Sequence, residues 1–236
     1  MYIDIIESAK AIDSRKIENS AVAIIDVLRA TSVMLTAFAN GAKSIIPVDS
    51  PAKAFALKKI YPEYLLGGEE DAIQVKGFDL DNSPFSYTRE IVANKTIVMS
   101  TSNGTKAIEG SKNANRLVIA SFLNANAIAQ ELKHEEKITL VCSGSNNSYT
   151  LEDALCAGYL VNLLQQHQPA SKLSDLAISL SSLSSIHQND IQNFASKGNH
   201  YQLLAQKGFQ KDLTYCFKKN RYDLIPELNN GVIQII

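Results

Sequence analysis

The chain has 236 residues, of which 45% are hydrophobic and 20% are charged. This composition and length allow a sizeable core and exclude a disordered chain. The 23 basic and 24 acidic residues leave a net charge of −1. That balance argues against a nucleic-acid partner, because proteins that neutralise phosphate backbones carry a basic surplus.

The segments up to residue 166 alternate short apolar runs with helical stretches. Strands are predicted at 21–25, 44–48, 96–99, 116–121 and 137–142, and helices at 33–39, 51–60, 125–133 and 151–166, with one more helix after 105. This alternation predicts an α/β fold in three layers, with a largely parallel or mixed sheet flanked by helices.

Residues 67–90 break the alternation, and we expect them to form a long loop with a flexible acidic turn at 67–71. A long loop in a compact domain is more often functional than accidental. Leucines at helical spacing (173, 176, 180 and 183) predict another helix at 171–185, and the C-terminal third has helical character. We expect one domain over 1–236, with a smaller C-terminal lobe from about residue 170 as the alternative.

Targeting signals are not evident in the sequence. Three cysteines without a Cys-x-x-Cys pair fit a reducing compartment better than a disulfide framework or a zinc knuckle. The N-terminus carries acids where a signal peptide carries bases. No apolar run approaches the ~20 residues of a membrane span. We therefore expect a cytoplasmic protein without a membrane partner.

Polar loops follow three of the predicted strands, at 26–32, 100–105 and 143–150. Parallel sheets bind ligands beyond the carboxyl ends of their strands. In the first loop, the Asp26 carboxylate suits a divalent metal, and the Arg29 fork matches phosphate or sulfonate. Thr31 opens a helix whose N-terminus favours an anion. The structural alternative is that Thr31 or Ser32 caps this helix and that Asp26 makes a structural hydrogen bond.

The second loop, Thr101 to Thr105, has hydroxyls, an amide and a glycine that suit an oxyanion held by backbone N–H groups. Ser-Asn-Gly is also a common turn. In the third region, Glu152 and Asp153 could be metal ligands or a general base. The alternative is a helix capping box formed by Thr150 and Asp153.

Other acidic and basic groups fit catalysis less well. Residues 79–83 mimic the nucleophile loop of haloacid-dehalogenase-type phosphatases, but no good apolar strand precedes them. The histidines lack metal-ligand spacing and are isolated at positions 134, 167, 187 and 200. We therefore expect carboxylates and a metal-bound water to do the acid–base chemistry.

Short motifs from about residue 20 to 230 together resemble the 2-phosphosulfolactate phosphatase family, which comprises magnesium-dependent acid phosphatases associated with coenzyme M biosynthesis. The matching stretches are Ile25–Thr31, Asn40–Ala42, Leu66–Glu69, Gly77–Leu80, Asn82–Pro84, Thr101 with Asn103–Thr105, Phe122–Ala125, Cys142 with Gly144, Leu151–Ala154, Cys156–Gly158, Leu203–Gly208, Asp212 and Pro226. Each motif is short, but their shared order makes the resemblance specific.

The resemblance implies Mg²⁺-dependent hydrolysis of a small anionic phosphate monoester, with 2-phosphosulfolactate giving sulfolactate and phosphate. We place the catalytic roles on Asp26, Arg29 and Asp153, and the metal on Asp26, Glu69, Glu152 and Asp153. The substrate-binding candidates are Thr31, Asn82, Ser83, Thr101, Asn103, Gly104, Thr105 and Gly144. A homodimer is expected from base rates alone.

The chain departs from the family pattern in one acidic region. Glu70 and Asp71 stand where the family usually has Arg-Gly, and Asp81 stands where it usually has Gly. A lost cation and added acids disfavour a dianionic substrate. The alternative function is therefore a non-catalytic module that binds small phosphate or sulfonate anions.

Overall fold

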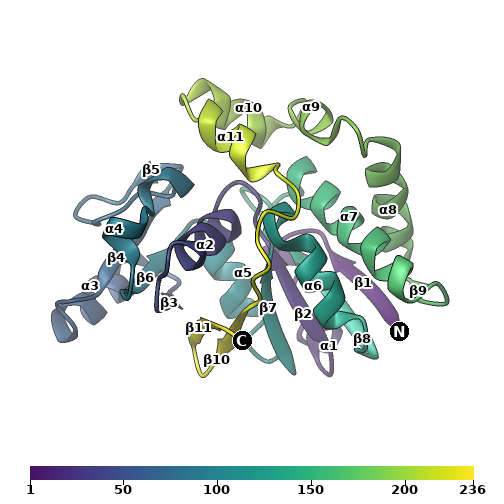
Figure 1. Ribbon diagram of the computed structural model, residues 1–236, viewed down its shortest axis with the longest axis horizontal. Coiled ribbons are helices and arrows are strands. Elements are labelled where there is room, and N and C mark those ends of the chain that lie inside the picture. Colours follow the sequence, from purple (N-terminus) through teal and green to yellow (C-terminus); the bar gives the residue numbers. More distant parts are fainter.

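The computed structural model describes all residues from 1 to 236 and confirms an α/β fold built on one mixed sheet (Figure 1). The sheet has 11 strands in the order β5-β4-β6-β3-β11-β10-β7-β2-β8-β1-β9. The strands are β1 (Tyr2–Ile6), β2 (Ala21–Ile25), β3 (Ser44–Pro47), β4 (Leu65–Glu70), β5 (Ile73–Gln74), β6 (Thr96–Ser100), β7 (Arg116–Ala120), β8 (Lys137–Cys142), β9 (Lys172–Leu173), β10 (Pro226–Asn229) and β11 (Val232–Ile235).

Helices cover both faces of this sheet. The central strand β2 is therefore buried on both sides, as its apolar residues require. Ala21, Ala23 and Ile25 pack against α6 and α7, whereas Val22 and Ile24 pack against α2 and α5. The α-helices are α1 (Ser14–Ile17), α2 (Ala30–Ala39), α3 (Pro51–Ile60), α4 (Arg89–Val92), α5 (Gly104–Gly110), α6 (Ala125–Leu132), α7 (Leu151–His167), α8 (Asp175–Ile186), α9 (Ile191–Ala195), α10 (Asn199–Gln206) and α11 (Gln210–Cys216). Three 3₁₀ turns complete the chain: η1 (Ala9–Ala11), η2 (Pro84–Ser86) and η3 (Phe122–Asn124).

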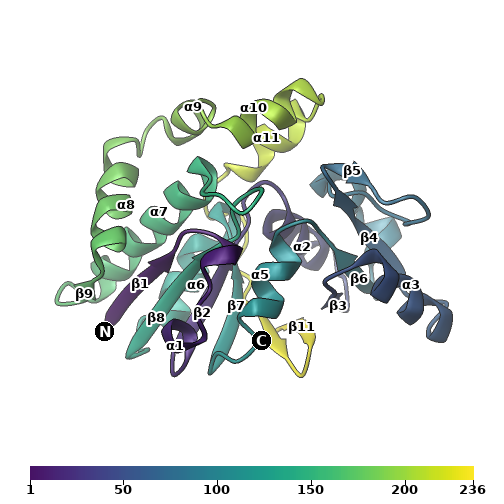
Figure 2. The same cartoon turned by 180° about the vertical axis from the view of Figure 1, so that it is seen from behind.

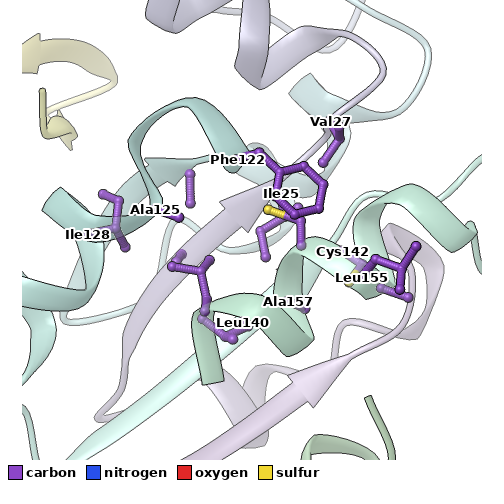
Figure 3. Close-up of a cluster of buried hydrophobic side chains, with 14 of the residues drawn as sticks. Ile25, Val27, Phe122, Ala125, Ile128, Leu140, Cys142, Leu155 and Ala157 are labelled. Atoms are coloured by element: carbon purple, nitrogen blue, oxygen red, sulfur yellow. The ribbon is translucent and has the colours of Figure 1, made fainter. Parts of the chain in front are cut away.

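The larger core lies between the sheet and α6, α7 and α8. Figure 3 shows Ile25, Phe122, Leu140 and Leu155 among the buried side chains of this core. Burial of each large aliphatic or aromatic side chain stabilises the fold by roughly 1.5–3 kcal/mol. This packed layer fixes the ends of β2 and β8, from which two of the polar loops leave.

The expected loop at 67–90 was wrong in its first part, because residues 65–70 form strand β4 beside β6. Gly67 and Gly68 suggested a flexible turn, but they permit close contacts instead. A Cβ on Gly67 would lie 2.3 Å from the Tyr87 hydroxyl, and one on Gly68 would lie 1.8 Å from the Ser100 carbonyl oxygen. Glycine within a strand often marks such a close approach.

Other boundaries also differ from the sequence prediction. Helix α2 begins at Ala30 and not at residue 33, and Leu173 lies in the short strand β9 outside α8. Strand β1, which pairs with β8 and β9, was not predicted. The C-terminal third is helical from α8 to α11, as expected, but its last strands, β10 and β11, were not predicted and form a hairpin that enters the sheet between β7 and β3. Its Asn230–Gly231 turn, with positive φ at both residues, is a typical hairpin signal.

The C-terminal helices form an arch over one end of the sheet. Figures 1 and 2 show α8 beside α7, with α9, α10 and α11 crossing above the loops before the chain descends to β10. Leu180, Leu204 and Leu213 of this arch pack into the main core. None of the helices combines the length and the apolar character that a membrane span requires.

Candidate active site

A polar pocket lies under the arch where the loops after β2, β4, β6 and β8 converge. The loop after β2 supplies Asp26 and Arg29, β4 supplies Glu69, and α10 supplies His200. The remaining lining residues are Leu28, Asp71, Ala72, Asn82, Ser102, Asn103, Ser145, Asn146, Leu203, Leu204 and Lys207. The structure therefore brings together five of the predicted residues: Asp26, Arg29, Glu69, Asn103 and, from the loop before η2, Asn82.

Asp26 is buried at the end of β2 with one carboxylate oxygen committed to the backbone. Its Oδ1 atom accepts a hydrogen bond from the Ala30 amide at 3.1 Å, and its Oδ2 atom has no protein hydrogen-bond partner. Burial raises the pKa of Asp26 to about 6, and the charges of Glu69 and Glu152 act in the same direction. His200 and the Ala30 amide oppose this rise. A perturbed carboxylate in a cleft is a typical functional group.

Thr31, predicted to bind substrate, instead shapes the backbone around Asp26. Its hydroxyl donates to the Asp26 carbonyl at 2.8 Å and accepts from the Asp26 amide at 3.1 Å. The side chain is fully buried and does not line the pocket. Thr31 therefore has a structural role, but not the helix cap of the structural alternative, because α2 has no side-chain cap hydrogen bond. Asp26 does make a structural hydrogen bond, to the Ala30 amide, and it also lines the pocket.

Glu69, expected to lie in a solvated turn, is buried and holds two loops together. Its Oε1 atom accepts from the Ser102 amide at 2.8 Å, and its Oε2 atom accepts from the Ala72 amide at 2.6 Å. The Ser102 hydroxyl also donates to Oε2, at 3.1 Å. Glu69 thereby joins the end of β4 to the loop after β6.

Glu152 and His200 form a buried pair that the sequence did not suggest. His200 Nδ1 lies 2.6 Å from Glu152 Oε1, while Glu152 Oε2 is buried without a hydrogen-bond partner. Burial lowers the pKa of His200, but the hydrogen bond and charge of Glu152 outweigh it and raise the pKa overall. The histidines lack metal-ligand spacing in the sequence, yet the structure brings His200 to the pocket beside Glu152. No local spacing could reveal this contact, because 48 residues separate the partners.

Asp153 lies behind the pocket and connects two of its loops. Its Oδ1 accepts from the Val27 amide at 2.8 Å, and its Oδ2 accepts from the Gly144 amide at 3.0 Å. Burial and the charges of Asp26 and Glu152 raise its pKa well above the usual value. The capping-box alternative was wrong, because Thr150 makes no cap hydrogen bond.

Gly144, predicted to bind substrate, serves this connection. Its φ of +67° and the 2.3 Å distance from a built Cβ to the Ser148 carbonyl oxygen both require glycine. Its amide is directed at Asp153, and the residue does not line the pocket.

The loop after β6 is fixed by reciprocal hydrogen bonds between two threonines. The Thr105 amide donates to Thr101 Oγ1 at 3.1 Å, and the Thr101 amide donates to Thr105 Oγ1 at 3.1 Å. Both side chains are buried, and neither lines the pocket, whereas Asn103 does. Gly104 allows the loop to approach Asp26, since a Cβ there would lie 2.8 Å from Asp26 Oδ2.

Arg29 is buried against the arch in an ion pair. Its Nη1 atom lies 2.7 Å from Asp212 Oδ2, and the Ser83 hydroxyl donates to Asp212 Oδ1 at 2.8 Å. The neighbouring Asn82 has a buried Oδ1 atom without a partner. Asp212 and Lys207 belong to the C-terminal motifs of the family resemblance, but the sequence predicted no site role for either residue.

The carboxylates around the pocket limit the kind of metal site that the protein can form. No group of three or more His, Cys, Asp or Glu side chains is placed to hold a metal ion, which disfavours a cage of protein ligands. Mg²⁺ commonly takes only one or two carboxylates, together with water and substrate phosphate. Asp26 Oδ2 and Glu152 Oε2 are both without partners, and their charges interact. Asp26 lines the pocket and Glu152 lines the adjoining hollow with His200, so these two carboxylates fit such a site. The oxygens of Glu69 and Asp153 are instead occupied by loop amides.

Comparison with known proteins agrees with the sequence motifs. The profile of the family described as 2-phosphosulpholactate phosphatase matches residues 6–231. A Clostridium perfringens protein named "Probable 2-phosphosulfolactate phosphatase" is 42% identical, over 100% of this chain and 97% of its own length. Proteins of the same name from Clostridium novyi and Clostridium acetobutylicum are 39% and 36% identical, each over at least 97% of both chains.

An α/β fold with this polar pocket, together with these matches, defines a phosphoric monoester hydrolase. The chain belongs to the 2-phosphosulfolactate phosphatase family, as its motifs predicted.

Proposed function

We propose that the protein hydrolyses 2-phosphosulfolactate, or a closely similar acidic phosphate ester, to the alcohol and inorganic phosphate with Mg²⁺. The main support is that Asp26 and Arg29, three residues apart on one loop, both line the pocket. The Asp26 carboxylate can bind a metal cation, and the Arg29 guanidinium can bind the phosphate anion. A metal–phosphate complex needs both groups side by side.

In this proposal Asp26 and Glu152 hold Mg²⁺, which would polarise a phosphoryl oxygen and orient water. Arg29 binds and orients the phosphoryl group through its remaining N–H donors, with Asn103 beside it. Glu69 and Asp153 keep the surrounding loops in register. His200, held by Glu152, is the group placed to donate a proton to the leaving alcohol oxygen.

The second acidic group of the substrate calls for another cation. Lys207 lines the pocket, and its Nζ donates to the Asp71 carbonyl oxygen across the pocket rim. Lys207 is thus placed to offset a sulfonate or carboxylate at the far end of the ester. Of the three acids that depart from the family pattern, only Asp71 lines the pocket, so the case for a pure binding module is weakened.

The cellular setting is also a proposal. Three buried cysteines without disulfides fit a cytoplasmic enzyme, and the family resemblance suggests a step of coenzyme M biosynthesis.

The test is phosphate release by the purified full chain from a panel of esters, with Mg²⁺ and after chelation. We expect turnover of 2-phosphosulfolactate with Mg²⁺ and none with the chelator. Calorimetric binding of inorganic phosphate without turnover of any ester would instead support the binding module.

A further inference from the structure

We propose that Asp212 is a positioning residue that holds the Arg29 guanidinium in the orientation needed to bind the phosphate group. This inference rests on the proposed function only in that the pocket must bind phosphate. It assigns a task to α11, which comes from the opposite end of the chain.

The geometry around Arg29 is closed on the side of the arch. The side chains of Arg29 and Asp212 are 2% and 5% exposed, and Nη1 and Oδ2 lie 2.7 Å apart. Phe209 stacks on the guanidinium at 3.8 Å from its ring centroid. One edge and one face of the guanidinium are thereby engaged, while Nε and Nη2 have no protein partner and Arg29 lines the pocket.

Asp212 is itself fixed from a second direction. The Ser83 hydroxyl donates to its Oδ1 atom at 2.8 Å, and Ser83 follows Asn82, which also lines the pocket. The carboxylate therefore ties the loop after β2, the loop before η2 and helix α11 to one point. Because the donors of the planar guanidinium have fixed relative directions, holding Nη1 of Arg29 on Asp212 and its face on Phe209 sets where the free donors point.

The alternative is that Asp212 merely neutralises the buried charge of Arg29. The two roles predict opposite changes in phosphate affinity when Asp212 is removed. A counter-charge weakens the attraction of Arg29 for phosphate, so its removal would tighten binding. A positioning residue pre-organises Arg29, so its removal would weaken binding. The direction of the change therefore discriminates between them.

The test is calorimetry of inorganic phosphate binding to the full chain with Mg²⁺ present. We expect Asp212→Ala to raise the Kd about 10-fold, which corresponds to ~1.4 kcal/mol. Asp212→Asn retains a hydrogen-bond acceptor for Arg29 and should recover most of the loss. In an Arg29→Met background, Asp212→Ala should have no further effect, because the effect acts through Arg29.

Two further variants keep the test decisive. Glu227→Gln is the control, because Glu227 Oε2 lies 2.7 Å from Arg116 Nε in an arginine ion pair away from the pocket. This variant should leave the Kd for phosphate unchanged. If Asp212→Ala does not fold, Ser83→Ala should still raise the Kd by loosening Asp212.

The inference would be overturned if both Asp212 variants bound phosphate more tightly or with an unchanged Kd. It would also be overturned if Asp212→Ala caused an equal loss in the Arg29→Met background, or if the wild type bound no phosphate. Absence of ester turnover alongside the expected Kd pattern would overturn only the proposed hydrolysis.

Discussion

His200 Nδ1 lies 2.6 Å from Glu152 Oε1, and this contact joins the start of α7 to the start of α10. Glu152 is 1% exposed and His200 is 15% exposed on their side chains. The arch is thus connected electrostatically to the carboxylates beneath it. Breaking a buried pair is costly because it leaves an uncompensated charge behind.

We expect His200→Ala to lower the free energy of unfolding by about 3 kcal/mol, because Glu152 loses its partner. The measurement is urea denaturation near pH 6, with chelator present. His187→Ala is the matched control: His187 also contacts a carboxylate, Asp190 at 3.0 Å, but Asp190 is 47% exposed. The control should change stability by less than about 1 kcal/mol. Equal losses in both variants would contradict the buried-pair interpretation.

The alternation of strands and helices up to residue 166 was predictable because β2, β6, β7 and β8 are short apolar runs buried in the sheet. Strand β4 was not, since its Gly67 and Gly68 resemble a turn until their contacts with Tyr87 and Ser100 are known. Local patterns report local structure, and these contacts are tertiary.

The same limit applies to the site. Asp26 and Arg29 could be proposed from one loop because strand ends in α/β proteins carry ligands. His200 and Asp212 could not, since their partners Glu152 and Arg29 are 48 and 183 residues distant. The sequence also could not show that Asp153 faces the loop amides and not the pocket.

Gly104 is expected to be essential for the geometry of Asp26. A Cβ at this position would lie 2.7 Å from Ala30 Cβ and 2.8 Å from Asp26 Oδ2. Gly104→Ala should therefore destabilise the protein by about 1–3 kcal/mol and reduce kcat/KM about 100-fold by displacing Asp26. Thermal unfolding and phosphate release would measure the two effects.

Gly110 provides the control for Gly104, because it ends the same helix α5. The nearest atoms to its added Cβ all belong to Ile12, with the flexible Cδ1 end closest at 3.0 Å. Gly110→Ala should leave activity unchanged. A loss of activity as large as that of Gly104→Ala would show that the helix, and not the approach to Asp26, is responsible.

Lys207 should affect the choice of substrate more than the rate of phosphate release. We expect Lys207→Met to raise KM about 10-fold for esters with a second acidic group, because an ion pair is lost. The KM for p-nitrophenyl phosphate, which lacks that group, should stay constant. Lys211→Met, on α11 outside the pocket, should change neither value; a KM increase for both esters would contradict the assignment.

Asp26→Asn should stabilise the metal-free protein at neutral pH while abolishing turnover. Burial raises the folded-state pKa of Asp26 to about 6 from 3.8. Asp26 therefore contributes stability below about pH 4 that is lost as pH rises through 6, when the buried carboxylate ionises near Glu69, Glu152 and Asp153. The asparagine variant avoids this loss and keeps an acceptor for the Ala30 amide.

Relative to wild type, the gain in unfolding free energy should grow between pH 4 and 6 and level off near 3 kcal/mol at most. Urea denaturation across pH 4–8 with chelator present measures it. Asp223→Asn, at an exposed position, should give a flat difference across this range. A wild type that is more stable than Asp26→Asn at pH 8 without metal would show that Asp26 is held as a structural anion and not strained by its burial.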